Sequence, residues 1–193
     1  MRRLLAILLV LGCGGVDPVQ AAPPGVRIYQ STTDNSITEG ETIIPGDPAE
    51  IYARVLDYPR WVDIFPQVAK VVITSQKGDD ARVTLVKPDG NKDNLHFHNQ
   101  PAARMLWFED TGNGGRAEVW AEIVFIPGTE PKTTRVHARL YAEVHGIASL
   151  VVGSGDIRKM RELKIESDLV AIRGYFQRLA SSQASGGGHA ASP

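Results

Sequence analysis

DIRKMRELKIESDLVAIRGYFQRLA, residues 156–180, is a long amphipathic stretch near the end of the chain. Its apolar side chains recur at spacings of four and three residues, which places them on one face of an α-helix. They are Ile165, Leu169, Ile172, Phe176 and Leu179. Such a helix is about 37 Å long, and Ser154 or Asp156 can cap its first turn. A helix of this length with a broad apolar face needs a large partner surface.

The chain before this helix supplies that partner as a succession of strands. Turn signals rich in Gly, Asp and Pro separate stretches of β-branched and aromatic residues. We expect strands at 70–76, 81–87, 95–99, 105–110, 117–126 and 133–144. The last two alternate between apolar and polar side chains, which is typical of an antiparallel sheet with one wet face. Their apolar faces include Ala121 and Ala138, small residues that leave room either for a close helix or for a cavity.

Two short helices are expected near the start of the domain, after a first strand or hairpin at 26–31 and 41–44. Asp47 can cap the first helix, with Pro48 at its first position and Glu50 completing a capping box. A second helical turn covers 59–65, and Pro66 ends it. The order of elements predicts an α+β helix-grip fold, in which a curved antiparallel sheet wraps around the long C-terminal helix. Such packing leaves an apolar pocket between sheet and helix.

The N-terminus, MRRLLAILLVLGCGG, is typical of an export signal, with two arginines before an apolar run too short to span a membrane. We expect residues 1–13 to be the signal segment, ending in a lipobox whose Cys13 becomes lipid-modified. The alternative is ordinary cleavage after Ala21. A Pro/Gly-rich linker at 14–25, a ligand-binding domain at 26–180 and a disordered tail at 181–193 complete the domain organisation.

Composition excludes several classes of protein. Lys and Arg number 21 against 22 for Asp and Glu, so the chain lacks the basic surface that nucleic acid requires. Cys13 is the only cysteine, which excludes disulfides and thiol catalysis in the folded domain. We expect a monomer that meets a membrane surface only through its N-terminal anchor.

The segment PAEIYARVLDYPRWVDIFPQVAKV, residues 48–71, together with the strands and final helix, resembles the START-like helix-grip superfamily (SRPBCC). Within it the chain is most similar to the polyketide cyclase/dehydrase and coenzyme-Q-binding group, over residues 26–179. This resemblance implies binding of lipids, sterols, quinones or polyketides under the long helix. Some members are cyclases or hydrolases, and many are carriers. The commonest members act inside the cell, so an export signal departs from the pattern.

Candidate ligand contacts come from four parts of the chain. The short helical turn offers a pocket gate, and the apolar strand faces offer a lining. The segment 146–155, apolar and bounded by glycines, could be a flap over the pocket, and the start of the long helix lies beside it. The predicted ligand-binding residues are Trp61, Ile64, Phe65, Phe97, Ile123, Leu140, Leu150 and Met160, with Ile157 and Leu163 as neighbours of Met160.

Titratable residues give no persuasive catalytic cluster. His96 and His98 point the same way on a strand, a spacing found in some zinc sites, but no third ligand is evident in the sequence. His145 follows the last strand at a possible cavity mouth. Either Glu109 or Asp110 can reach the pocket. The sequence does not decide which of them does, because residues 105–108 are all apolar and give no alternation between the two faces of the strand. Glu118, Glu122, Arg139 and Glu143 fall on the wet strand faces. We therefore predict no catalytic residue, no metal and no cofactor.

These observations favour a non-catalytic carrier for an apolar small molecule of lipid, sterol, quinone or isoprenoid type. We expect it to be exported to the bacterial cell envelope or periplasm and held there by a lipid anchor. The alternatives are a cyclase or hydrolase acting on a hydrophobic substrate in the same cavity, and an interaction module whose cavity has collapsed.

Overall fold

The computed structural model describes residues 25–112, 114–145 and 153–186. The predicted signal segment with Cys13, nearly all of the linker, the segment 146–152 with Leu150, and residues 187–193 lie outside these ranges. Of the helices in the described residues, none is long and apolar enough to cross a membrane.

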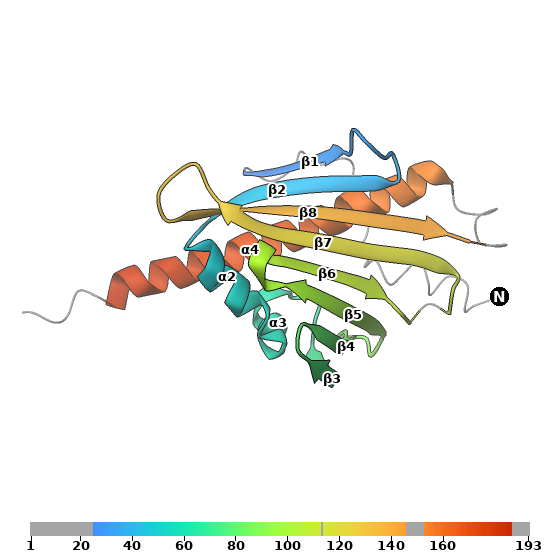
Figure 1. Ribbon diagram of the computed structural model, residues 1–193, viewed down its shortest axis with the longest axis horizontal. Coiled ribbons are helices and arrows are strands. Elements are labelled where there is room, and N and C mark those ends of the chain that lie inside the picture. Colours follow the sequence, from blue (N-terminus) through green and yellow to red (C-terminus); the bar gives the residue numbers. More distant parts are fainter. Residues whose placement is uncertain (1–24, 113, 146–152, 187–193) are drawn as a thin grey trace, which may run out of the picture.

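One antiparallel sheet of eight strands forms the body of the protein, in the order β1-β2-β8-β7-β6-β5-β4-β3 (Figure 1). The strands are β1 Val26–Gln30, β2 Ile37–Pro45, β3 Lys70–Lys77, β4 Asp80–Val86, β5 Lys92–Gln100, β6 Met105–Asp110, β7 Ala117–Pro127 and β8 Thr133–Val144. All six strands expected after residue 70 are present, and the first hairpin pairs with the last strand. The predicted α+β fold with a long C-terminal helix is confirmed.

Two short helical segments follow the β1–β2 hairpin. Helix α2, Pro48–Val55, begins as predicted, with the Asp47 carboxylate accepting a hydrogen bond of 2.8 Å from the Ala49 amide. The second segment consists of a 3-10 turn, η1 (Tyr58–Arg60), and helix α3 (Trp61–Ile64). Helix α2 packs on β7 and β8, so these segments cover one part of the sheet's inner face.

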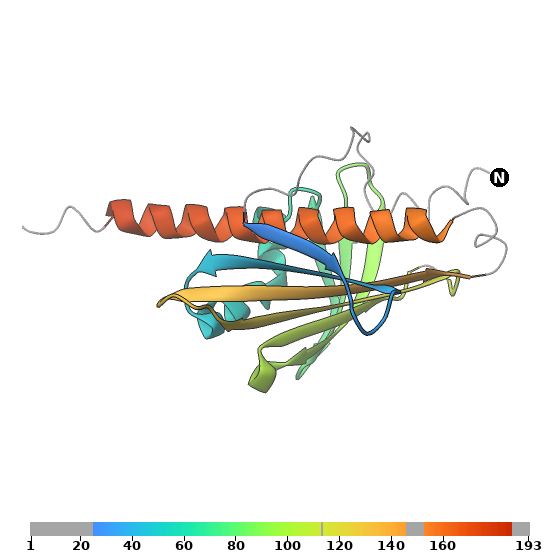
Figure 2. The ribbon, with the colours of Figure 1, turned by 90° about the horizontal axis from the view of Figure 1, so that it is seen from above.

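Helix α4, Ser154–Gly186, lies along the inner face of the sheet beside β1, β2 and β8 (Figures 1 and 2). Four residues of the predicted stripe are buried against the sheet: Ile165, Leu169, Ile172 and Phe176. The helix continues past its predicted end at Ala180. It ends at Gly186, so serines that indicate a flexible tail by composition lie in a helix here. The hydroxyls of Ser181 and Ser185 donate to carbonyls of the preceding turn, at 3.0 Å each.

The helix approaches the sheet closely at Gly40 in β2. A Cβ atom on this residue would lie 2.4 Å from Cγ2 of Ile165 and 2.9 Å from Cδ1 of Leu169. Ala138 is the register partner of Gly40 on β8 and is itself buried. At this place the small residues of the inner face serve the close approach of a helix, one of the two alternatives that their size left open.

A buried cation, Arg161, fixes the N-terminal half of α4. Only 4% of the residue is exposed, and its guanidinium donates to Thr38 Oγ1 at 3.1 Å and to the carbonyl of Ala142 at 3.2 Å. A third bond of 3.1 Å reaches the carbonyl of Asn35. Burial lowers the pKa of Arg161. A charged residue does not count toward an apolar stripe, and for this reason the sequence did not place Arg161 against the sheet.

Candidate functional site

The predicted gate residues form part of the aromatic core. Trp61 is 4% exposed, and its ring centroid lies 5.0 Å from that of Phe65 and 5.4 Å from that of Phe97. The Trp61 indole donates a 2.8 Å hydrogen bond to the Val55 carbonyl. Packing of the short helices on the sheet accounts for these contacts. The other buried members of the predicted set are Ile64, Ile123 and Leu140. Their role as ligand contacts stays a prediction.

The start of α4 is more open. Met160 and Ile157 are half-buried there, so both retain surface that a ligand could cover. Leu163 is 44% exposed, and its role as a ligand contact stays a prediction. It lies on the solvent side of the helix, two residues from Arg161 and Ile165, which face the sheet. Leu150 lies outside the described residues.

The parity of β6 is settled by its pairing with β5. Phe108 stands opposite Phe97, with ring centroids 5.0 Å apart, and Leu106 is fully buried. Leu106, Phe108 and Asp110 therefore lie on the inner face, while Trp107 and Glu109 lie on the outer face. Asp110, rather than Glu109, is the carboxylate on the side of the predicted pocket.

The inner face is incompletely covered toward the C-terminal end of β6. Val71, Phe108 and Val119 pack against the core but are only half-buried. By contrast, Ala142, the register partner of Val119, is buried. These apolar side chains keep part of their surface accessible although they lie on the inner face. An apolar ligand would bury surface of this kind.

A hollow of about 660 Å³ opens between β6 and β7, and Val119 is one of its lining residues. The two strands pair as far as Glu109 and Trp120 and then diverge, whereas β7 remains paired with β8 to its first residue. The hollow is open at the edge of the sheet, and residues of both faces line it. Asp110, Ala117 and Val119 belong to the inner face, whereas Trp107, Glu109, Glu118 and Trp120 belong to the outer face. His145 lines this hollow, and its place at the mouth of a pocket under the long helix stays a prediction. The sequence could not predict this hollow, because the pattern of residues along a strand does not show where its pairing with the next strand ends.

Charged groups gather on the same part of the inner face. Asp93 of β5 lies 3.2 Å from the Lys87 ammonium. Burial raises the pKa of Asp93 above its ordinary value of 3.8, and Asp110 adds to this rise while Lys87 opposes it. From α4, Lys164 bonds to Asp168, which also accepts a 3.2 Å hydrogen bond from Gln67. Asp93 was not among the residues predicted from the sequence, because its strand was expected to begin only at Leu95.

Replacing Asp93 by asparagine is expected to flatten the pH dependence of stability. A raised pKa means that the folded state binds this proton more tightly than the unfolded chain does. The contribution of Asp93 to stability is therefore full below its ordinary value of 3.8 and is lost as pH rises through the raised pKa. The unfolding free energy should fall less between about pH 3 and about pH 6 in Asp93→Asn than in the wild type, measured by urea denaturation.

Asp63→Asn is the matched control for this experiment, since Asp63 is an exposed carboxylate on α3. It should keep the wild-type pH profile. An Asp93→Asn profile identical to that of the control would contradict the placement of Asp93 on the buried side of the sheet.

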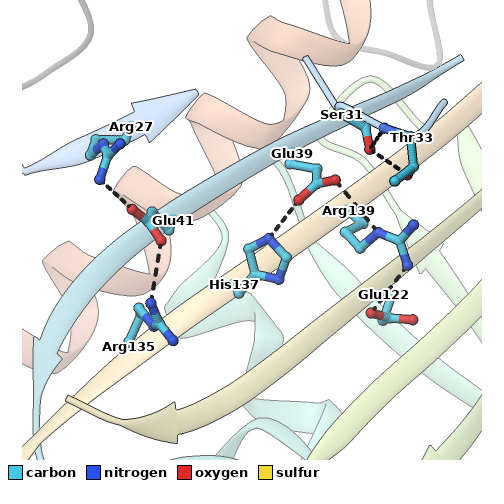
Figure 3. Close-up of polar contacts among 9 residues, drawn as sticks. All are labelled: Arg27, Ser31, Thr33, Glu39, Glu41, Glu122, Arg135, His137 and Arg139. Carbon is cyan, nitrogen blue, oxygen red and sulfur yellow. Dashed lines mark hydrogen bonds and ion pairs between the residues drawn. The ribbon is translucent and has the colours of Figure 1, made fainter. Parts of the chain in front are cut away.

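The outer face carries cross-strand ion pairs on β1, β2, β8 and β7 (Figure 3). Glu39 lies 3.0 Å from His137 and 4.0 Å from Arg139, which in turn lies 3.7 Å from Glu122. Burial opposes ionisation of Glu39, but hydrogen bonds from Ser31 and His137 outweigh it and lower its pKa. A second chain of ion pairs runs beside this one through Arg27, Glu41 and Arg135. Glu122 and Arg139 thus stabilise the sheet, as their place on the wet faces predicts.

Comparison with known proteins places the fold. A START superfamily protein from Mycobacterium smegmatis matches 74% of this chain and 98% of its own, at 15% identity and a TM-score of 0.60. The Zhui aromatase/cyclase from Streptomyces sp. R1128 matches 80% of this chain and 96% of its own, at 17% identity and a TM-score of 0.61. A protein from Thermus thermophilus matches 76% of this chain and 99% of its own, at 20% identity and the same TM-score of 0.61.

No family model matches the sequence, and no curated protein matches it either. At these identities the structural likeness shows a shared START-like helix-grip fold.

Proposed function

We propose that the protein binds and carries an apolar small molecule of lipid, sterol, quinone or isoprenoid type. The observation that carries the proposal is the half-buried apolar surface of Val71, Phe108 and Val119 on the inner face of the sheet, where Val119 also lines the hollow between β6 and β7. Covering such surface contributes about 25 cal/mol per Å² before the costs of binding. The fold supports the same reading, because the START superfamily protein and the aromatase/cyclase described above share it.

Polar groups at the hollow would set the orientation of the ligand. Asp110 and His145 line it, and Asp93 lies next to Asp110 on the inner face. A few polar groups in an otherwise apolar site are the usual means of fixing a ligand's direction. A molecule with a long apolar body and one hydrogen-bonding end, such as a quinone or an isoprenoid alcohol, fits this distribution.

Native mass spectrometry of the purified full chain, with organic extraction of bound molecules, tests the proposal. The expected result is a single apolar adduct per chain that the extract identifies. A chain that carries no apolar adduct and takes up no fluorescent lipid probe would contradict the carrier.

An enzyme of cyclase or hydrolase type is the second candidate, and the position of Asp93 favours it. A carboxyl whose pKa is raised by burial is a proton donor suited to acid catalysis. The two candidates differ in the fate of the ligand. A carrier returns the extracted molecule unchanged after incubation, whereas an enzyme converts it. In the second case Asp93→Asn or Asp110→Asn would stop the conversion while binding persists.

We further propose that the chain is exported and anchored through a lipid on Cys13. Two arginines, a short apolar run and the sequence before the single cysteine support this address. Cys13→Ala is expected to move most of the protein from the membrane fraction to the soluble fraction of the cell envelope. The variant has no cysteine to carry the acyl chain that would hold it on the membrane. Immunoblotting of separated fractions measures the shift, with Cys13→Ser as a second variant. An unchanged membrane fraction would contradict the lipid anchor, and a wild-type protein that is already soluble would favour the alternative site after Ala21.

A further inference from the structure

We propose that Asp80, His96 and His98 form a binding site for a divalent first-row transition-metal ion, with Zn²⁺ as its reference ligand. The site lies on the outer face of the sheet and does not depend on the carrier function. The sequence offered only the two histidines. The third ligand comes from β4, where Asp80 stands opposite His98 in the register of β4 and β5.

The three side chains already converge. Asp80 Oδ1 lies 2.6 Å from His98 Nδ1 and 3.7 Å from His96 Nε2. One ligand atom from each residue can be chosen so that all lie within 4.8 Å of one another. Ligands held at about 2.1 Å in a tetrahedral zinc site are about 3.4 Å apart. The observed separations lie on both sides of that value, so rotation of the side chains can seat the ion without moving the strands.

Backbone hydrogen bonds of three adjacent strands hold the site in place. His96 and His98 alternate with buried residues on β5 and therefore share its outer face. Their ring centroids are 4.1 Å apart, and the ring of Trp107 packs 5.1 Å from that of His98. Within residues 25–112, 114–145 and 153–186, no other group of three His, Cys, Asp or Glu side chains converges in this way.

Glu109 supplies the supporting contact that metal-bound histidines usually have. It stands opposite His96 on β6, with its carboxylate 3.4 Å from His96 Nδ1. A carboxylate at this nitrogen holds its proton and leaves Nε2, the nitrogen on the side of Asp80, as the electron-pair donor. An ion bound between them would replace the direct 2.6 Å contact of His98 with Asp80.

The donor set selects the class of ion. Two imidazoles and one carboxylate suit zinc, nickel, copper and iron(II), whereas calcium and magnesium prefer oxygen alone. Three protein ligands leave at least one position for water or a further ligand. Lys77 and Arg82 stand opposite Asp80 and His96 in register, and their positive charges lower the affinity for a dication.

Calorimetric titration of the untagged, metal-free full chain with ZnCl₂ tests the proposal. The expected result is saturable one-to-one binding with a Kd below about 100 µM. Asp80→Asn and His98→Ala should each weaken it by at least about tenfold, and Glu109→Gln by about tenfold through His96. Asp80→Asn nearly preserves the shape of the side chain, and circular dichroism verifies that each variant is folded. Replacement of Zn²⁺ by Co²⁺ should give the visible absorption of a low-coordinate nitrogen and oxygen site.

His137→Ala is the matched control. His137 also lies on the outer face beside a carboxylate, Glu39, yet within the described ranges no third ligand converges on that pair. The control should bind zinc as the wild type does. The absence of saturable binding, or binding that survives His96→Ala/His98→Ala, would overturn the proposal, and so would equal losses in His137→Ala and His98→Ala.

Discussion

Leu169→Ala is expected to lower the free energy of unfolding by about 2–5 kcal/mol. Leu169 is fully buried, and its side chain faces β2 at the point where Gly40 lets the helix approach. Truncation there removes apolar contact and opens a cavity that neither a regular helix nor a paired strand can close. Urea denaturation measures the loss, and the Tm should fall by roughly 5 to 15 °C.

Val170→Ala is the control for this change. Val170 is the next residue on α4 and is 39% exposed, so its truncation should alter the free energy of unfolding by no more than about 0.5 kcal/mol. Equal effects at the two positions would contradict the packing of α4 on the sheet. A loss at Leu169 below about 1 kcal/mol would do so as well.

The elements themselves could be predicted because each depends on a local pattern. The period of α4 and the alternation in β7 and β8 are properties of consecutive residues, and burial follows both patterns. Asp47 as the cap of α2 is equally local. By contrast, the inner face of β6 could not be predicted, because residues 105–108 are all apolar and only the pairing of Phe108 with Phe97 decides it.

The candidate sites depend on pairing to a still greater extent. Asp80 and His98 meet because the register of β4 and β5 brings them together, and no spacing within one strand shows this. The hollow between β6 and β7 exists because these strands stop pairing after Glu109 and Trp120. Asp93 is buried because it lies on the inner face of β5. The hydrophobicity pattern alone does not predict a carboxylate on that face. The fold could therefore be predicted from local patterns, whereas the hollow between β6 and β7 and the polar groups beside it required the structure.

Val119→Trp is expected to weaken uptake of a fluorescent apolar probe by the full chain at least about tenfold. Val119 lines the hollow and is half-buried on the inner face. An indole at this position projects into the space that the probe would occupy, and the apolar surface of Phe108 is then covered by the protein itself. Because the side chain enters open space rather than packed core, the free energy of unfolding should change by less than about 1.5 kcal/mol.

Ile43→Trp separates blocking of the hollow from a general effect of an added tryptophan. Ile43 lies on β2 and is 44% exposed, so a larger side chain there should leave both probe uptake and stability as in the wild type. Equal uptake by Val119→Trp and Ile43→Trp would show that the ligand enters elsewhere. The half-buried start of α4 at Ile157 and Met160 would then be the next surface to fill, because it also retains accessible apolar area.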